Sequence, residues 1–151
     1  MKVNLRFESK DPNGDVIVSN FLAVMEIRKN NYKIVYMEDL SGEGISTKST
    51  IMLARNELRL IRDGEIKADF LFGTNMVHNT AYKTVYGDIP VTLQTKDYSF
   101  DIKGAKEKDS FELEKSYMVT AQVLYDLIID GAPQEMNMKI YVTSWDENIN
   151  V

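Results

Sequence analysis

The sequence predicts an all-β fold, an antiparallel up-and-down barrel of about eight to ten strands with little or no helix. Segments with a two-residue hydrophobic period recur along nearly the whole chain. Short turn sequences, rather than long crossovers, join most of these segments, which is the pattern of an antiparallel meander. An open meander leaves two exposed edges, so we expect the sheet to close and enclose a shared interior.

The first half of the chain alternates strands with turns. The expected strands span residues 2–10, 16–28, 32–38, 45–55, 58–62 and 65–72. Three turns carry residues that tight reversals favour: Asp11-Pro12-Asn13-Gly14, Asn30-Asn31 and Asp63-Gly64. Residues 39–44 are expected to be a loop, and so are residues 73–79.

Residues 80–96 give the clearest hairpin pattern of the second half. Its first strand places Thr80, Tyr82, Thr84 and Tyr86 on one side, and Gly87-Asp88 suits a type II′ turn. Further strands are expected at residues 97–103 and 135–144, with a polar connection at 104–109.

The alternating segment at residues 111–130 is too long for one flat strand, because typical strands have about 3–10 residues. We expect a break or bulge near Lys115-Ser116. Residues 110–117 are the one candidate for a short helical turn. The whole chain, 1–151, is expected to be one domain with a loosely docked tail at 145–151.

Composition restricts the function. With 23 acidic and 18 basic residues the net charge is −5, which argues against binding to nucleic-acid backbones; residues 103–108 are the one basic-leaning run. The absence of cysteine excludes disulfides, thiolate metal sites and cysteine nucleophiles. Without an apolar leader or a membrane-length apolar run, the sequence indicates a soluble, intracellular protein.

Several short motifs resemble the YwiB-like family of small bacterial proteins of unknown function. They are Phe70-Leu71-Phe72-Gly73, residues 81–87 (AYKTVYG), residues 93–96 (LQTK) and Tyr125-Asp126-Leu127. The likeness extends over roughly residues 3–143, although the segment from 104 to 118 is longer than that family's usual connection. The resemblance implies a calycin-type, lipocalin-like barrel in a cytoplasmic bacterial protein, and it supplies no catalytic residues.

The candidate ligand-binding residues are side chains that a barrel lumen could present: Phe70, Phe72, His78, Thr80, Tyr82, Thr84 and Tyr86. The competing interpretation is that these rings fill the barrel, which is favoured because small barrels are often packed solid. For His78, the single histidine, a plain polar loop residue is the favoured interpretation over a general base.

No catalytic residue and no metal or cofactor site is expected. The acidic stretches at residues 11–15 and 38–43 lack calcium-loop spacing, and Glu112 with Glu114 is a commonplace pair on a solvated face. Phosphate-binding and nucleophile-elbow motifs are missing from the sequence.

The leading functional hypothesis is a noncatalytic barrel that binds a small molecule in its lumen. The alternative is a protein–protein interaction or structural module with a filled core, for which the long segment at residues 119–129 is the motivating feature and a homo-oligomer is one form. An enzyme comes third, and RNA binding is disfavoured by the acidic charge. No membrane partner is expected.

Overall fold

The computed structural model describes residues 1–40 and 42–145, which form ten antiparallel strands. The strands are β1 (Lys2–Lys10), β2 (Val16–Ile27), β3 (Tyr32–Glu38), β4 (Thr47–Leu53), β5 (Glu57–Asp63), β6 (Ala68–Gly73), β7 (Val77–Thr84), β8 (Gly87–Ala105), β9 (Leu113–Ile129) and β10 (Ala132–Ser144). The predicted all-β fold is confirmed. Among the described residues, none belongs to a helix with the length and apolar character needed to cross a membrane.

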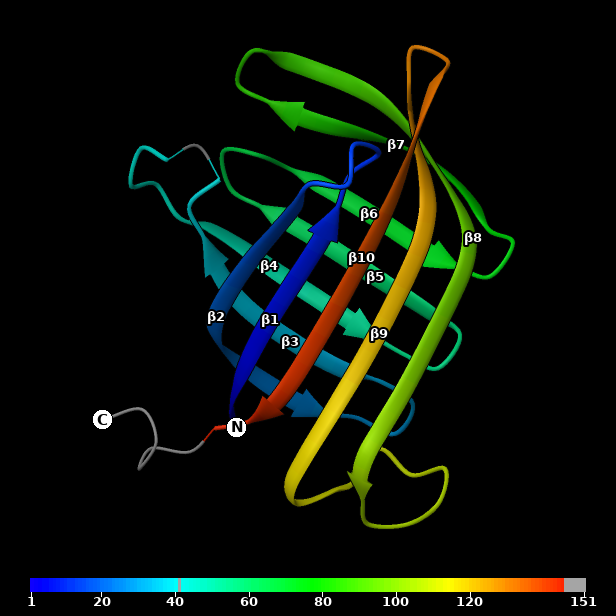
Figure 1. The fold of residues 1–151 in the computed structure, drawn as a ribbon. Coiled ribbons are helices and arrows are strands. Elements are labelled where there is room, and N and C mark those ends of the chain that lie inside the picture. The colour runs from blue at the N-terminus through cyan, green and yellow to red at the C-terminus, as the bar shows by residue number, and fades with distance from the viewer. Residues whose placement is uncertain (41, 146–151) are drawn as a thin grey trace.

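The strands form one sheet that curls into a nearly closed barrel. The first and last strands pair in register, residues 3–10 against residues 137–144, so β1 and β10 lie in the middle of the sheet. Its two edges are β6 and β7. They meet at one bridge, where the backbone N–H groups of Lys67 and Lys83 donate to each other's carbonyls at 2.9 and 2.8 Å. Figure 1 shows β1, β8, β9 and β10 running steeply across the front, with β3 to β6 crossing behind them. This up-and-down arrangement is consistent with the predicted calycin-like barrel.

The hairpin between β7 and β8 differs from the predicted one in its turn. Thr84 pairs with Gly87, so Val85 and Tyr86 form the loop, and the expected turn at Gly87-Asp88 is wrong. Thr84 Oγ1 stabilises the loop by accepting a hydrogen bond from the Tyr86 N–H at 3.1 Å and donating one to the Gly87 carbonyl at 2.9 Å. Gly87 follows the loop with a φ of 129°, which a residue without Cβ adopts readily.

The long hairpin of β8 and β9 contains irregular strand pairing at the place where a break or bulge was predicted. Residues 87–105 form one strand, with register shifts between Thr95 and Asp97 and between Lys103 and Ala105. At the second shift several β9 residues, including Lys115 and Ser116, lie opposite a single β8 residue. The bulge alternative of the prediction is therefore confirmed, within a strand β9 that is continuous. The expected helical turn at 110–117 is wrong, because residues 113–117 belong to β9 and residues 110–112 form neither helix nor strand.

The barrel core is packed, and one end is plugged by Phe111 from the β8–β9 connection. Its ring centroid lies 4.9 Å from that of Tyr32 and 5.8 Å from that of Phe100. The Tyr32 hydroxyl donates to the Phe111 carbonyl at 2.7 Å, and the Arg55 guanidinium lies over the Phe111 ring. Tyr32 is the first residue of β3, so the plugged end is the end at which β3 begins. The unplugged end lies near Glu38, where β3 ends.

The apolar run at residues 119–129 is a core strand rather than an exposed interface. Val119 and Val123 are fully buried in the core, and β9 is flanked by β8 and β10 along its length. Core packing therefore accounts for the run that motivated the interaction hypothesis. The predicted tail falls largely on residues 146–151, outside the described residues.

Candidate functional site

A lateral opening separates β2 from β3 at the unplugged end of the barrel. Residues 24–27 of β2 pair with residues 32–35 of β3, whereas residues 16–23 of β2 pair with β1 alone. Tyr36 and Glu38 on β3 consequently have no β2 partner. Ile17, on the unpaired part of β2, is 69% exposed although it lines the interior. The two strands diverge here and give access to the barrel interior.

A pocket of about 210 Å³ lies behind this opening. Its lining comes from seven strands on the inner face of the barrel and combines aromatic rings with a few polar side chains: Phe7, Ser9, Ile17, Ser19, Phe21, Tyr36, Glu38, Leu60, Arg62, Phe70, Phe72, Tyr125 and Met138. The residues from β2 and β3 all belong to the unpaired stretches described above. The pocket therefore exists because these two strands separate.

Glu38 and Arg62 form an ion pair on the pocket wall. Arg62 Nε donates to Glu38 Oε2 at 3.3 Å, and Ser49 Oγ donates to the same oxygen at 2.6 Å. The side chains of Arg62 and Glu38 are 19% and 11% exposed, and Ser49 is fully buried. Such shielding from water strengthens charge-assisted hydrogen bonds, and it makes an unpaired charge costly.

Strand register produces this arrangement. Tyr36 pairs with Ser49 across β3 and β4, and Ser49 pairs with Arg62 across β4 and β5, so all three side chains lie in one row on the inner face. Side chains two positions apart on a strand share a face, which places Glu38 beside Tyr36. The small side chain of Ser49 leaves room for the Glu38 carboxylate to reach Arg62.

The Tyr36 hydroxyl is buried without a hydrogen-bond partner among the described residues. It lies close to Ser49 and Glu38, but Ser49 donates its hydrogen bond to Glu38 instead. Burial raises the pKa of Tyr36 well above its usual value, and the nearby Glu38 carboxylate raises it further. Burial also raises the pKa of Tyr125 to about 12, against the effect of Arg62. Both hydroxyls therefore stay protonated near neutral pH.

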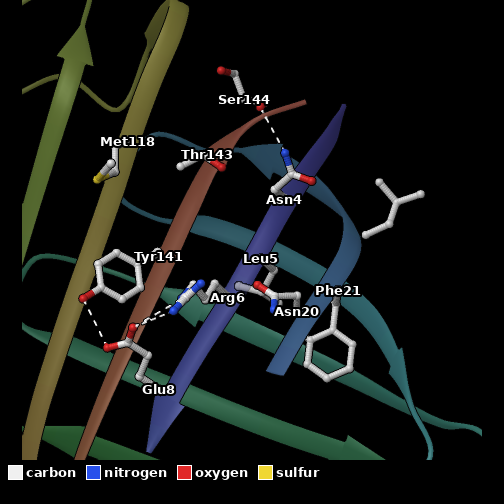
Figure 2. Close-up of a pocket in the computed structure, with 11 residues that line it drawn as sticks. Asn4, Leu5, Arg6, Glu8, Asn20, Phe21, Met118, Tyr141, Thr143 and Ser144 are labelled. Atoms are coloured by element: carbon white, nitrogen blue, oxygen red, sulfur yellow. Dashed lines mark hydrogen bonds and ion pairs between the residues drawn. The ribbon is translucent and has the colours of Figure 1, made fainter. Parts of the chain in front are cut away.

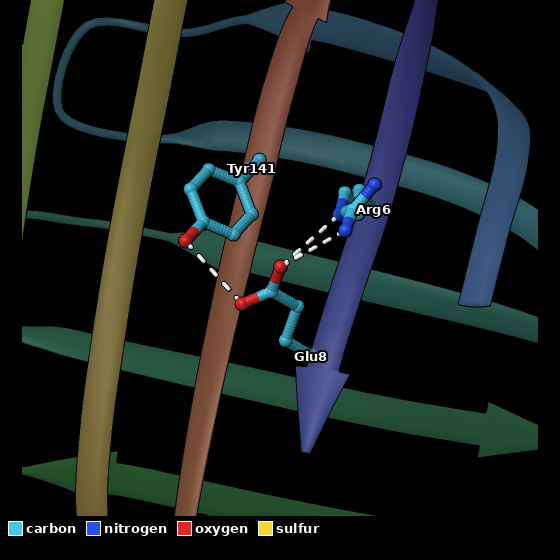
Figure 3. A network of polar contacts seen from close by, with 3 residues as sticks. All are labelled: Arg6, Glu8 and Tyr141. Carbon is cyan, nitrogen blue, oxygen red and sulfur yellow. Dashed lines mark hydrogen bonds and ion pairs between the residues drawn. The ribbon is translucent and has the colours of Figure 1, made fainter. Parts of the chain in front are cut away.

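A larger concavity, about 930 Å³, lies on the outer face of β1, β2, β9 and β10. Figure 2 shows Arg6 and Glu8 of β1 and Tyr141 of β10 on this face, with Met118 of β9 at one side. Arg6 Nη2 donates to Glu8 Oε1 at 3.1 Å, and the Tyr141 hydroxyl donates to Glu8 Oε2 at 3.5 Å (Figure 3). The Arg6 side chain is 48% exposed, and such solvated pairs contribute little binding energy. This outer groove is open surface rather than an enclosed site.

The acidic loops use their carboxylates to order the backbone. Asp11 Oδ1 accepts two backbone N–H groups of its own loop at 2.9 and 3.0 Å. Asp39 accepts the N–H groups of Gly42 and Gly44 at 2.9 and 2.8 Å. Within residues 1–40 and 42–145, no three His, Asp or Glu side chains gather as potential metal ligands.

Comparison with known proteins assigns the family. The model of a domain of unknown function (DUF1934) matches residues 2–140. The chain belongs to this family. The crystal structure of the ywiB protein from Bacillus subtilis is similar over 96% of this chain and 91% of that chain, with a TM-score of 0.74 and 18% sequence identity. At this identity the likeness concerns the fold. No curated protein matches the chain. The resemblance to the YwiB-like family is confirmed.

Two of the predicted lumen residues line the interior pocket of this DUF1934 domain, namely Phe70 and Phe72. Tyr82 stacks on Phe70 with ring centroids 6.2 Å apart. Tyr86 is 98% exposed at the tip of the β7–β8 loop, so its predicted place in the lumen is wrong. The physical reason is the two-residue displacement of the turn, which removes Tyr86 from the strand.

The remaining predicted residues lie on β7. His78 and Thr80 pair with buried Leu93 and Val91 of β8, so they share the inner face, but they are not in the pocket lining. His78 belongs to a strand rather than to a loop, and its Nε2 lies 3.0 Å from the Asp69 carbonyl of β6. Because a carbonyl only accepts, Nε2 donates this hydrogen bond, which links the two edge strands β6 and β7. Thr84 bonds within the hairpin loop.

The polar residues of the pocket were not predicted from the sequence. Two patterns contained a signal for them. Glu38 continues the inward series of Tyr32, Ile34 and Tyr36, and Arg62 continues that of Leu58 and Leu60. Opposite charges at the ends of two inward-facing apolar series are unusual, because buried charges require partners.

Proposed function

We propose that this DUF1934 barrel is a noncatalytic binding protein that takes a small molecule into the pocket between β2 and β3. The observation that carries the proposal is a shielded polar cluster inside an aromatic cavity. Enclosed pockets with apolar walls and a few converging polar groups are the usual form of ligand sites. The pocket of about 210 Å³ is smaller than most drug-sized sites, so a compact ligand fits the proposal.

Unused hydrogen-bonding capacity supports binding. The Tyr36 hydroxyl has no partner among the described residues, and Arg62 uses only Nε in the hydrogen bonds found there. Buried polar groups are nearly always hydrogen-bonded in folded proteins. A ligand in the pocket, or water in its absence, would supply the missing partners.

The state of Glu38 supports a noncatalytic role. Its Oε2 already accepts hydrogen bonds from Ser49 and Arg62, which engage this oxygen in holding the pocket wall. The cytoplasmic location and the absence of nucleic-acid and membrane partners stay predictions from the sequence, which cell fractionation and pull-down experiments test.

Filling the cavity tests the proposal. Saturation-transfer NMR with a set of compact aromatic fragments would be run on the native protein, on Ser19→Phe and on Ser99→Phe. Ser19 lines the pocket, whereas Ser99 is exposed on β8. We expect fragments to bind the native protein and Ser99→Phe but not Ser19→Phe, with thermal unfolding confirming that both variants fold. Equal binding by both variants, or none by the native protein, would exclude the pocket.

A second candidate function, self-association through β2, is favoured by a specific observation. Val16, Val18, Leu22 and Val24 point outward from β2 and are 44–58% exposed. Three of these residues belong to the stretch 16–23, which has no strand partner on its β3 side. An exposed apolar edge of this kind is a template for pairing with a second copy.

Sedimentation velocity distinguishes this candidate. Val18→Lys should convert a dimer to a monomer, whereas Val85→Lys, at an exposed position of the β7–β8 loop, should leave the dimer intact. A native protein that stays monomeric across the accessible concentration range would rule it out.

A further inference from the structure

We infer that the interior pocket selects compact neutral molecules in which a planar apolar body carries a hydrogen-bond donor and acceptor side by side, as in a primary carboxamide. The inference rests on the proposed binding function and specifies the chemical class of the ligand. It is carried by three features of the pocket: its charge balance, its free donors and acceptors, and the shape of its walls.

The charge balance favours a neutral ligand. Glu38 and Arg62 compensate each other within the pocket, at 3.3 Å and with 11% and 19% of their side chains exposed. An anion would have to compete with Glu38 for the guanidinium, and a cation would have to compete with Arg62 for the carboxylate. Either would leave one shielded charge without a counter-charge, which is unfavourable in a poorly solvated site.

The hydrogen-bonding groups that remain are complementary to an amide. Arg62 bonds to Glu38 through Nε, and among the described residues its Nη groups make no hydrogen bond and can act as donors. Glu38 accepts from Ser49 and Arg62 at Oε2, and among the described residues Oε1 accepts no hydrogen bond and can act as an acceptor. A carboxamide accepts through its oxygen and donates through its NH₂ group, and the two are adjacent. It can therefore bond both members of the ion pair without separating them.

The walls favour a planar body. Phe7, Phe21 and Tyr36 form one aromatic cluster, with ring centroids 4.8–6.1 Å apart. Phe72 and Tyr125 form a second, with centroids 4.8 Å apart. The pocket volume is about 210 Å³. A single ring with one short substituent fits this space and can stack on either cluster.

Three probes that share one ring test the selectivity: benzamide, benzoate and benzylamine, the last as its ammonium ion at neutral pH. Affinities are measured by NMR titration of the native protein at fixed ionic strength. We expect benzamide to bind at least about tenfold more tightly than either charged probe. Benzoate or benzylammonium binding as tightly as benzamide would overturn the inference, and this comparison needs no variant.

Charge removal provides the second readout. Glu38→Gln leaves the guanidinium uncompensated and should shift the preference toward benzoate by about tenfold. Arg62→Gln should shift it toward benzylammonium by a similar factor. The double variant, neutral again, should regain the preference for benzamide. Arg59→Gln removes an arginine on the outer face of the same strand and should change nothing. A preference for benzamide that persists in both single variants would also contradict the inference.

The outcomes separate this inference from the function on which it rests. If fragments bind in a way that Ser19→Phe abolishes but benzamide is not preferred, the selectivity is wrong and the binding function stands. If none of the three probes binds and the fragment set gives no Ser19-dependent signal, both are wrong.

Discussion

Replacing Arg62 with Met tests whether the Glu38–Arg62 pair is shielded enough to matter energetically. At an Nε–Oε2 distance of 3.3 Å, Coulomb's law with an effective dielectric constant of about 20 gives an attraction of roughly 5 kcal/mol before desolvation is counted. Breaking a fully buried pair costs about 3–5 kcal/mol, whereas exposed pairs contribute about 0.2–1 kcal/mol. Because this pair is mostly but not wholly shielded, we expect Arg62→Met to lower the free energy of unfolding by about 2 kcal/mol.

Urea unfolding with linear extrapolation measures the effect. Arg59, on the same strand, donates from Nε to Asp69 at 2.8 Å, but the side chains of this pair are 49% and 41% exposed. Arg59→Met is therefore the matched control and should cost less than about 1 kcal/mol. The double variant Glu38→Gln with Arg62→Met should recover much of the loss, because no unpaired charge is left. Equal costs for Arg62→Met and Arg59→Met would refute the view that the pocket shields this pair.

Three further predictions concern the barrel itself. Gly104→Ala should lower the free energy of unfolding, measured in urea, clearly more than Gly131→Ala does. Both glycines have a positive φ, at which a residue with a side chain loses about 1–2 kcal/mol. Of these two positions, only at Gly104 would the added Cβ collide with backbone, at the Ser116 carbonyl oxygen. Hydrogen exchange should be faster where β6 meets β7 than between β1 and β10, because among the described residues one backbone bridge, Lys67 to Lys83, joins β6 to β7, whereas β1 and β10 pair over eight residues each. Equal protection of the two would contradict this. The pKa of Tyr125 is raised to about 12 in the folded protein, from about 10 in the unfolded chain. Its contribution to stability is therefore complete below about pH 10 and is lost as pH rises through the folded value. Tyr125→Phe should reduce the loss of unfolding free energy at alkaline pH, and an unchanged dependence of that free energy on pH would contradict this.

The sequence was sufficient for most of the strands because their signal is local. An inward-facing series such as Val3, Leu5 and Phe7 has the same two-residue period wherever the strand lies in the sheet. The bulge near Lys115-Ser116 was also predictable, since so long an alternating run exceeds an ordinary flat strand. The turn of the β7–β8 hairpin was misplaced by two residues, because glycine is favoured both within tight turns and directly after them. Because of this displacement, Tyr86 was predicted to face the lumen, whereas it lies in the exposed β7–β8 loop.

The site depends on long-range pairing that no single segment reveals. The lateral opening arises because β2 pairs with β3 only over residues 24–27, whereas residues 16–23 pair with β1 alone. The ion pair arises because β4 places Ser49, rather than a larger residue, between Tyr36 and Arg62. Phe70 and Phe72 line the pocket, in agreement with the sequence pattern that places them on the inner face of a core strand. The charged residues were passed over because, taken alone, Glu38 and Arg62 read as the polar ends of their strands.

Intermolecular nuclear Overhauser effects between benzamide and the protein test most directly whether the barrel interior is a binding site. The predicted result is a set of contacts from the benzamide ring protons to Phe72 and Tyr125, which line the pocket. Contacts to Tyr141 in the outer groove instead, or no contacts at saturating benzamide, would contradict an interior site.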